Sequence, residues 1–146
     1  MNFRICISLF LLCCLLQPST AQKPVTKPKE VTVKAMTYNT YSGRKQGIDK
    51  IAEVIKKENP DIVSLQEIER NTEINPWDTP KKLSELTGMK YYYFAHALDI
   101  PTGGDYGNVI LSKYPVSEEK SFKLSVLKEG DYVRSCLLYT SDAADE

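Results

Sequence analysis

The 146-residue sequence has few cysteines, and none lies in the part of the chain that is expected to fold. Cys6, Cys13 and Cys14 stand near the start and Cys136 stands near the end, so residues 22–135 contain no cysteine. This absence excludes a disulfide framework and a thiolate metal site from that part. Its stability must therefore come from an apolar core.

The sequence also lacks an excess of charge of either sign. Residues 22–135 carry 18 basic and 16 acidic side chains, because one basic residue precedes this range and three acidic residues follow it. A net formal charge of +2 gives no strong attraction to nucleic acid or to an anionic membrane. With 42% hydrophobic and 26% charged residues overall, the composition is that of an ordinary globular protein rather than a disordered one.

The chain has no apolar run of the roughly 20 residues that are needed to span a bilayer. Its longest run, Ile5 to Leu16, follows Arg4 and is closed by Pro18. This layout is typical of a secretory signal peptide over residues 1–21, with cleavage expected after Ala21. We therefore expect a protein that is secreted or periplasmic and that keeps no stable membrane span after cleavage.

Two other interpretations of this N-terminal stretch stay open. It can form a buried helix, or the chain can be a lipoprotein modified at Cys13 or Cys14, although neither cysteine follows the small residue expected before a lipidated one. Residues 22–30, which are rich in Lys and Pro, are interpreted as an extended linker to the folded domain.

Hydrophobic periodicity predicts a βαβ unit at the start of that domain. Residues 31–38 are rich in β-branched side chains and predict a strand, with Val33, Ala35 and Thr37 on one face. Residues 48–58 repeat apolar side chains every three or four positions, which predicts an amphipathic helix ended by Asn59 and Pro60. The apolar run 61–66 then predicts a second strand parallel to the first.

Weaker patterns predict the remaining elements. A helix is expected to begin near Thr79, a plausible cap that is followed by Pro80 at the first helical position, and to end near Thr87 and Gly88. Strands are expected over the aromatic segment 89–97 and over residues 107–112, with one or two more strands within 116–127.

Two polar residues directly follow the two predicted parallel strands. They are Asn39 and Glu67, and the carboxyl ends of parallel strands meet at the sheet edge where ligands usually bind. A carboxamide can hydrogen-bond a phosphate oxygen or place a water molecule, and a carboxylate is a hard oxygen ligand for Mg²⁺ or Mn²⁺. By spacing alone, a surface-loop asparagine and a solvated glutamate explain the same pattern.

Three strings carry more information than this spacing. "MTYNTYSG", "NPDIVSLQEIER" and "GGDYGNVILSKYPV" occur in an order that resembles the endonuclease/exonuclease/phosphatase superfamily, which has the deoxyribonuclease I-like fold. The resemblance covers residues 31–116 and implies an α/β fold of two packed mixed sheets flanked by helices. Residues 31–135 would form the N-terminal half of this two-sheet sandwich. The resemblance also implies a metal-dependent phosphoesterase.

Carried over by position, the resemblance assigns Asn39 as an active-site asparagine and Glu67 as the glutamate that binds Mg²⁺, with Mn²⁺ as an alternative ion. Asp61, in the "PD" pair, is expected to be a structural turn residue. Arg70 lies three residues past Glu67 and is a candidate donor to a phosphate, with an exposed loop arginine as the equal alternative.

Three further polar residues lie near the third string. Tyr106 and Asn108 flank Gly107 at the entrance to a predicted strand and are candidate substrate contacts, although a tight turn also explains them. His96 is the only histidine and lies inside the predicted aromatic strand. We therefore expect His96 to be a hydrogen-bonded or surface residue rather than the general acid or base.

The blocks that the family carries farther along, "GDxN" and "SDH", are absent before Ser135. Residues 136–146 resemble the translation of a sequencing adaptor, so the natural protein is expected to continue past Ser135; a genuine polar C-terminus is the alternative. Without those proton-transfer groups we expect the chain itself to be nearly inactive. With one sheet incomplete, we also expect it to be marginally stable or prone to aggregation.

For the complete protein we predict a secreted Mg²⁺-dependent hydrolase that acts on phosphate esters. Its substrate class stays open among nucleic acid, phospholipid head groups and small phosphoesters. A noncatalytic secreted binding domain of the same fold is the alternative, and the presence of both Asn39 and Glu67 argues against it.

Overall fold

The computed structural model of the chain describes residues 30–126, 128 and 133–140. The predicted signal peptide, the lipidation alternative, the linker up to residue 29 and the last six residues of the adaptor-like stretch lie outside the described residues. The chain divides into two units, residues 1–30 and 31–146, and every described helix and strand belongs to the second. In the described part of the chain, no helix is long and apolar enough to cross a membrane.

Four strands of the second unit form one mixed sheet with the order β1-β2-β4-β3, and two more strands pair as a separate hairpin. The elements are β1 (Ala35–Asn39), α1 (Ile48–Glu58), β2 (Ile62–Arg70), α2 (Thr79–Thr87), β3 (Tyr91–Asp99), β4 (Asp105–Ser112), β5 (Glu118–Leu124) and β6 (Arg134–Thr140). β1 and β2 are parallel, as the sequence predicts, whereas β2, β4 and β3 pair antiparallel.

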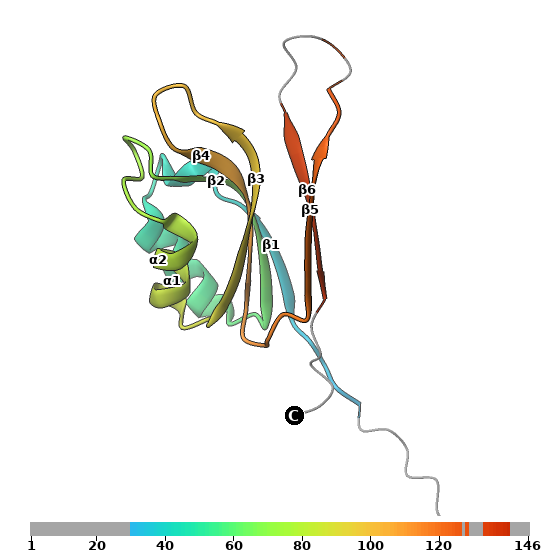
Figure 1. The fold of residues 1–146 in the computed structure, drawn as a ribbon. Helices are drawn as coiled ribbons and strands as arrows, with labels where there is room; N and C mark the ends of the chain where they lie inside the picture. Colours follow the sequence, from blue (N-terminus) through green and yellow to red (C-terminus); the bar gives the residue numbers. More distant parts are fainter. Residues whose placement is uncertain (1–29, 127, 129–132, 141–146) are drawn as a thin grey trace, which may run out of the picture. The chain divides into compact units, whose positions relative to one another are not determined.

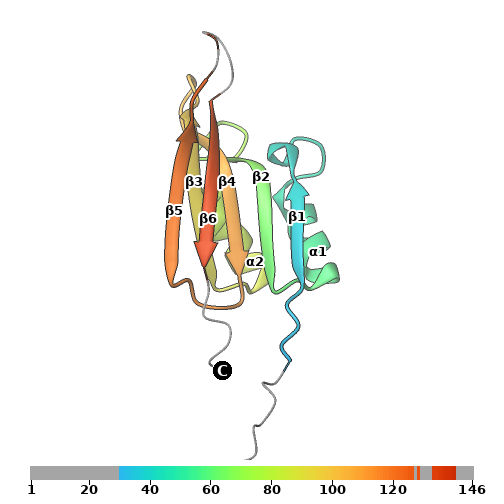
Figure 2. The same cartoon turned by 90° about the vertical axis from the view of Figure 1, so that its right-hand side faces the viewer.

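The helices and the hairpin cover opposite faces of this sheet. α1 and α2 pack on one face, and the hairpin of β5 and β6 lies over β3 and β4 on the other (Figures 1 and 2). The core fills the space between the helices and the sheet because both α1 and the central strands direct apolar side chains there. Its fully buried members include Ile55, Val63, Leu65, Ile68, Leu83, Val109 and Leu111.

Helix α1 has the bounds that its periodicity predicts. Ile48, Ile51, Ala52 and Ile55 are buried, and they occupy the stripe that the three- and four-residue spacing defines. Asn59 caps the C-terminus in the left-handed conformation, with its N–H bonded to the carbonyl of Ile55 at 2.8 Å.

Helix α2 has the predicted end but a different cap. Asp78 is the N-cap, and its side chain accepts a hydrogen bond from the N–H of Lys81 at 3.4 Å. Thr79, which the sequence suggested as the cap, is fully buried and donates its hydroxyl to the carbonyl of Glu69 at 2.6 Å. This hydrogen bond from Thr79 anchors the first turn of α2 to β2.

Several strand bounds differ from the prediction. β1 starts only at Ala35, and its helix-side face consists of Met36 and Tyr38, which pack against the core. β2 continues to Arg70, four residues beyond its predicted end, so Glu67 lies inside a strand rather than after it. Fully buried and less buried residues alternate in β2 only as far as Gln66. An alternating sequence pattern therefore cannot predict that the strand continues to Arg70.

The segment 116–127 contributes one strand, β5, whose seven residues are all exposed. Phe122 and Leu124 are each about half exposed on this strand. The marginal stability or aggregation expected from the sequence stays a prediction. The partner strand β6 includes residues 136–140 of the adaptor-like stretch, and the adaptor origin of that stretch stays a prediction.

Candidate metal and phosphate site

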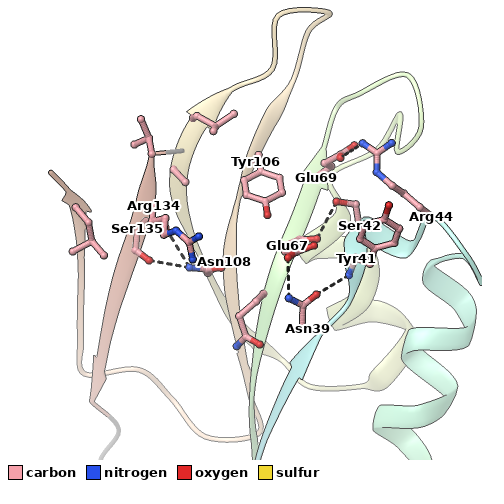
Figure 3. Close-up of a pocket in the computed structure, with 15 residues that line it drawn as sticks. Asn39, Tyr41, Ser42, Arg44, Glu67, Glu69, Tyr106, Asn108, Arg134 and Ser135 are labelled. Carbon is pink, nitrogen blue, oxygen red and sulfur yellow. Dashed lines mark hydrogen bonds and ion pairs between the residues drawn. The ribbon is translucent and has the colours of Figure 1, made fainter. Parts of the chain in front are cut away.

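A cavity of about 790 Å³ opens at the carboxyl end of β1, with β2, β4 and β6 contributing to its walls. Figure 3 shows polar side chains from all four strands directed into it. Four of the five site residues that the sequence predicts are among its lining: Asn39, Glu67, Tyr106 and Asn108. The sheet edge expected from the βαβ unit therefore does carry a cavity.

Glu67 reaches the cavity because β2 contains a β-bulge. Leu65 pairs with Val109 and Ile68 pairs with Gly107, so two residues of β2 stand opposite one residue of β4. Glu67 has a positive φ of 59°, which is uncommon for a residue other than glycine. Such outliers concentrate at functional sites, where surrounding contacts hold them in place.

Asn39 and Glu67 are in direct contact. The Nδ2 of Asn39 donates to Oε1 of Glu67 at 2.9 Å, and the Oδ1 of Asn39 accepts from the N–H of Tyr41 at 3.0 Å (Figure 3). These two bonds together fix which end of the Asn39 amide faces the carboxylate. The second N–H of that amide has no acceptor within the described part of the chain and is available to a ligand.

The free carboxylate oxygen of Glu67 is the kind of ligand that a hard divalent cation prefers. Oε2 of Glu67 receives no hydrogen bond from the described residues, and the carboxylate is only partly buried on the cavity wall. Mg²⁺ keeps several of its waters and commonly takes one or two protein carboxylates, so a single glutamate oxygen beside an open cavity suits it. Glu67 is the residue that would hold the ion.

An arginine that the sequence patterns did not single out also lines the cavity. Arg44 follows β1 and forms an ion pair with Glu69, a carboxylate whose side chain is only 5% exposed. The pair raises the pKa of Arg44, mainly through the hydrogen bond and the charge of Glu69. Thr72 donates its hydroxyl to the other oxygen of Glu69 at 3.3 Å. Arg44 lies five residues beyond the end of β1, and no local sequence pattern indicates its ion pair with Glu69.

In the view of Figure 3, Tyr106 has Arg134 on one side and Glu67, Glu69 and Arg44 on the other. Burial raises the pKa of its hydroxyl, and the charges of Glu67 and Glu69 raise it further, whereas Arg134 and Arg44 act in the opposite direction. The phenol is therefore protonated at neutral pH, so its hydroxyl is able to donate a hydrogen bond.

Asn108 has a structural partner in the same cavity. Its Nδ2 donates to the carbonyl of Ser135 at 2.9 Å, which ties β4 to β6. The side chain oxygen accepts no hydrogen bond from the described residues and stays open to a ligand. Contact of Asn108 or Tyr106 with substrate remains a prediction.

Comparison with known proteins decides the family. Residues 36–137 match the model of the endonuclease/exonuclease/phosphatase family. The chain belongs to this family. No curated protein sequence matches it.

Solved structures of family members share the fold. One from Beutenbergia cavernae matches with a TM-score of 0.66 and 27% identity over 77% of this chain and 35% of its own. A family protein from Leptotrichia buccalis matches with a TM-score of 0.60 and 15% identity, over 76% of this chain and 49% of its own. The mannosyl-6-phosphatase Bt3783 of Bacteroides thetaiotaomicron matches with a TM-score of 0.51 and 17% identity, over 77% and 48%.

The chain thus spans about a third to a half of the length of the structures that it matches. The predicted fold class, part of a deoxyribonuclease I-like α/β domain, is confirmed. The roles that the resemblance assigned to Asn39 and Glu67 remain predictions.

Arg70 is the predicted site residue that the structure does not bring to the cavity. Its Nε donates to Asp105 at 2.8 Å, and its guanidinium lies 4.1 Å from the centre of the Phe94 ring. Both contacts hold Arg70 against the neighbouring strands, because Phe94 lies in β3 and Asp105 lies in β4. Nothing in its placement supports contact with a phosphate at Glu67.

His96, Asp99 and Asp105 form a group of side chains of the types that can ligate a metal. Nε2 of His96 lies 3.0 Å from Oδ1 of Asp99 and 3.7 Å from Oδ1 of Asp105. None of the three lines the cavity, and Asp105 is already paired with Arg70. His96 is thus hydrogen-bonded and partly exposed, in the environment that its place in an aromatic strand suggested.

Asp61 lies at the start of β2, at the opposite end of the strand from the cavity. Its carboxylate accepts from the N–H of Lys34 at 2.8 Å and from the Nζ of Lys113 at 3.1 Å. The backbone bond from Lys34, followed by the Lys113 contact, lowers the pKa of Asp61. These bonds join β1, β2 and the end of β4, which agrees with a structural role.

Proposed function

We propose that the complete protein is a secreted, Mg²⁺-dependent phosphoesterase whose metal is held by Glu67. The observation that carries the proposal is the Glu67 carboxylate, which is hydrogen-bonded to Asn39 through one oxygen and open to the cavity through the other. Family membership supports hydrolysis of a phosphate ester. The name of one structural relative, a mannosyl-6-phosphatase, supports a phosphoester substrate.

The chain's own side chains are suited to binding and orienting a phosphoryl group. A bound Mg²⁺ supplies Lewis-acid stabilisation of phosphoryl charge. The remaining N–H of Asn39 and the protonated hydroxyl of Tyr106 can donate to phosphate oxygens. Arg44 and Arg134 add positive charge on two sides of the same cavity.

Proton transfer is the function that these residues do not supply. Among the described residues, the cavity lining contains no histidine and no aspartate. Hydrolysis also needs groups that take a proton from water and deliver one to the leaving oxygen. This composition supports the proposal that the 146-residue chain by itself has little activity.

The proposed partner is a phosphate ester, and its class stays open among nucleic acid, phospholipid head groups and small phosphoesters. Export is proposed from the layout of residues 1–21. Near-neutral charge over residues 22–135 supports a discrete substrate more than tight, nonspecific duplex binding.

The test is an assay of the protein encoded by the locus extended beyond Ser135. Release of p-nitrophenol from its phosphate mono- and diester is measured with Mg²⁺ and with EDTA. We expect activity that EDTA removes and that Glu67→Gln lowers by about 10²- to 10³-fold in kcat/KM. Activity that persists in EDTA, or that is unchanged in Glu67→Gln, contradicts the proposal. Absence of activity in every condition favours the noncatalytic alternative.

A further inference from the structure

The bulge in β2 decides which side of the sheet the Glu67 carboxylate faces. Val63 and Leu65 are fully buried on the helix side, and strict alternation would place residue 67 on that side as well. The extra residue shifts the pattern by one, so Ile68 takes the buried place and Glu67 lines the cavity. A regular strand would direct this carboxylate into the apolar core.

The conformation that produces this shift is unfavourable for glutamate. A left-handed backbone brings the Cβ of an L-residue close to a neighbouring carbonyl oxygen, so it is unfavourable for residues other than glycine. The bulge also takes backbone groups out of the regular ladder of hydrogen bonds, and buried backbone groups need partners. Contacts from elsewhere in the chain must therefore hold Glu67 in place.

Two hydroxyl groups supply those contacts. Thr40 Oγ1 lies at hydrogen-bond distance from two carbonyls and can donate to that of Gln66 at 2.9 Å or to that of Glu67 at 3.0 Å. Ser42 Oγ donates to the same Glu67 carbonyl at 3.1 Å. Both side chains are buried, at 8% and 3% exposure for Thr40 and Ser42. Their bonds converge on the two residues that form the bulge.

The loop that carries these hydroxyls is itself anchored. The backbone N–H of Thr40 bonds to the carbonyl of Gln66 at 3.0 Å, and the carbonyl of Ser42 accepts from Nδ2 of Asn75 at 3.0 Å. Asn75 is buried and is held in turn through the hydroxyl of Thr72, which accepts from its N–H at 3.0 Å. Hydrogen bonds to Gln66 and Asn75 therefore fix the position of the loop that carries the Thr40 and Ser42 hydroxyls.

We propose that Thr40 and Ser42 are positioning residues for Glu67, which hold the bulge that turns its carboxylate out of the core and toward the metal and phosphate site. Asn39, the last residue of β1 and the neighbour of Thr40, bonds the Glu67 side chain directly. Residues 39–42 thus fix both the backbone and the carboxylate of Glu67. The effect on metal binding rests on the function proposed above, whereas the effect on the Glu67 backbone does not.

The experiment compares variants of the 146-residue chain by NMR. Thr40→Val and Ser42→Ala each remove one hydroxyl, and Thr40→Ser keeps it. Thr87→Val is the matched control, because it removes a hydroxyl that donates to a helix carbonyl at 2.7 Å far from the cavity. The first readout is the intraresidue HN–Hα NOE of Glu67 without metal, which is strong only at positive φ. The second is Mn²⁺ affinity, measured by paramagnetic broadening.

Thr40→Val and Ser42→Ala are expected to weaken the Glu67 NOE and to lower Mn²⁺ affinity by about tenfold, the usual effect of losing a residue that orients a metal ligand. Thr40→Ser and Thr87→Val are expected to preserve both signals. If Thr40→Val does not fold, the milder Ser42→Ala decides the result.

An unchanged NOE and unchanged Mn²⁺ affinity in a folded Ser42→Ala or Thr40→Val variant overturns the inference. A lost NOE in these variants, together with a wild-type chain that binds no Mn²⁺ at Glu67, supports the positioning role and counts against the metal site. The two proposals therefore fail in distinguishable ways.

Discussion

Gly107 is the position in the sheet where a single methyl group is expected to do the most damage. A Cβ at this residue of β4 would lie 2.1 Å from the carbonyl oxygen of Ala95 and 2.9 Å from Cζ of Phe94. Contacts below 3.0 Å to a backbone atom of β3 cannot be relieved by rotating a side chain. The variant Gly107→Ala must therefore push β3 away from β4.

The expected cost follows from two opposing effects. Inserting a methyl group into a packed region costs about 1–3 kcal/mol, and a backbone obstacle places Gly107→Ala at the upper end. Replacing glycine in a strand recovers about 0.5–1 kcal/mol of unfolded-state entropy. We expect a net loss of about 2 kcal/mol in the free energy of unfolding. Gly88→Ala is the control, because its φ of 76° is strained but its Cβ meets nothing within 4 Å.

Urea unfolding followed by far-UV circular dichroism measures both variants, with equal m-values as the condition for comparing them. Gly88→Ala is expected to cost about 1 kcal/mol from its left-handed backbone alone. Gly107→Ala should exceed it by about 1 kcal/mol or more, or fail to fold. A Gly107→Ala protein as stable as the wild type would refute the close approach of β3 and β4 on which this expectation depends.

Three other predictions concern single side chains. Asp61 has a lowered pKa in the folded state, so it stabilises the fold above its unfolded pKa and loses that contribution as the pH falls through its folded pKa; Asp61→Asn should flatten the fall in urea-unfolding stability below about pH 4. Thr79→Val should cost about 1–2 kcal/mol in the same assay, because its buried hydroxyl is bonded to β2. In the complete protein, Arg44→Ala should weaken inorganic phosphate binding by calorimetry, whereas Arg70→Ala should not; the reverse order would contradict the placement of these arginines.

Local patterns were sufficient for the elements whose cause is local. The bounds of α1 follow from four apolar residues on one stripe and from the Asn-Pro stop, and α2 ends at the expected glycine. The parallel pairing of β1 and β2 follows from the helix between them. Four residues singled out from the motif strings, Asn39, Glu67, Tyr106 and Asn108, line one cavity in the structure.

Long-range contacts determined the features that sequence patterns did not predict. The bulge at Glu67 depends on hydroxyls about 25 residues away in the chain, so the prediction ended β2 four residues early. The direction of Arg70 depends on Asp105 and Phe94, both in strands that pair only after folding. Arg44 lines the cavity and is paired with Glu69, and no local sequence pattern indicates this ion pair.

The most direct test of the central claim is to locate the metal on this chain. Mn²⁺ added to the isotopically labelled protein broadens NMR signals near the ion, and Mg²⁺ should compete. We predict broadening centred on Glu67 and the side-chain amide of Asn39, lost in Glu67→Gln. Broadening centred instead on the cluster of His96, Asp99 and Asp105, or unchanged in Glu67→Gln, would contradict a metal site at Glu67.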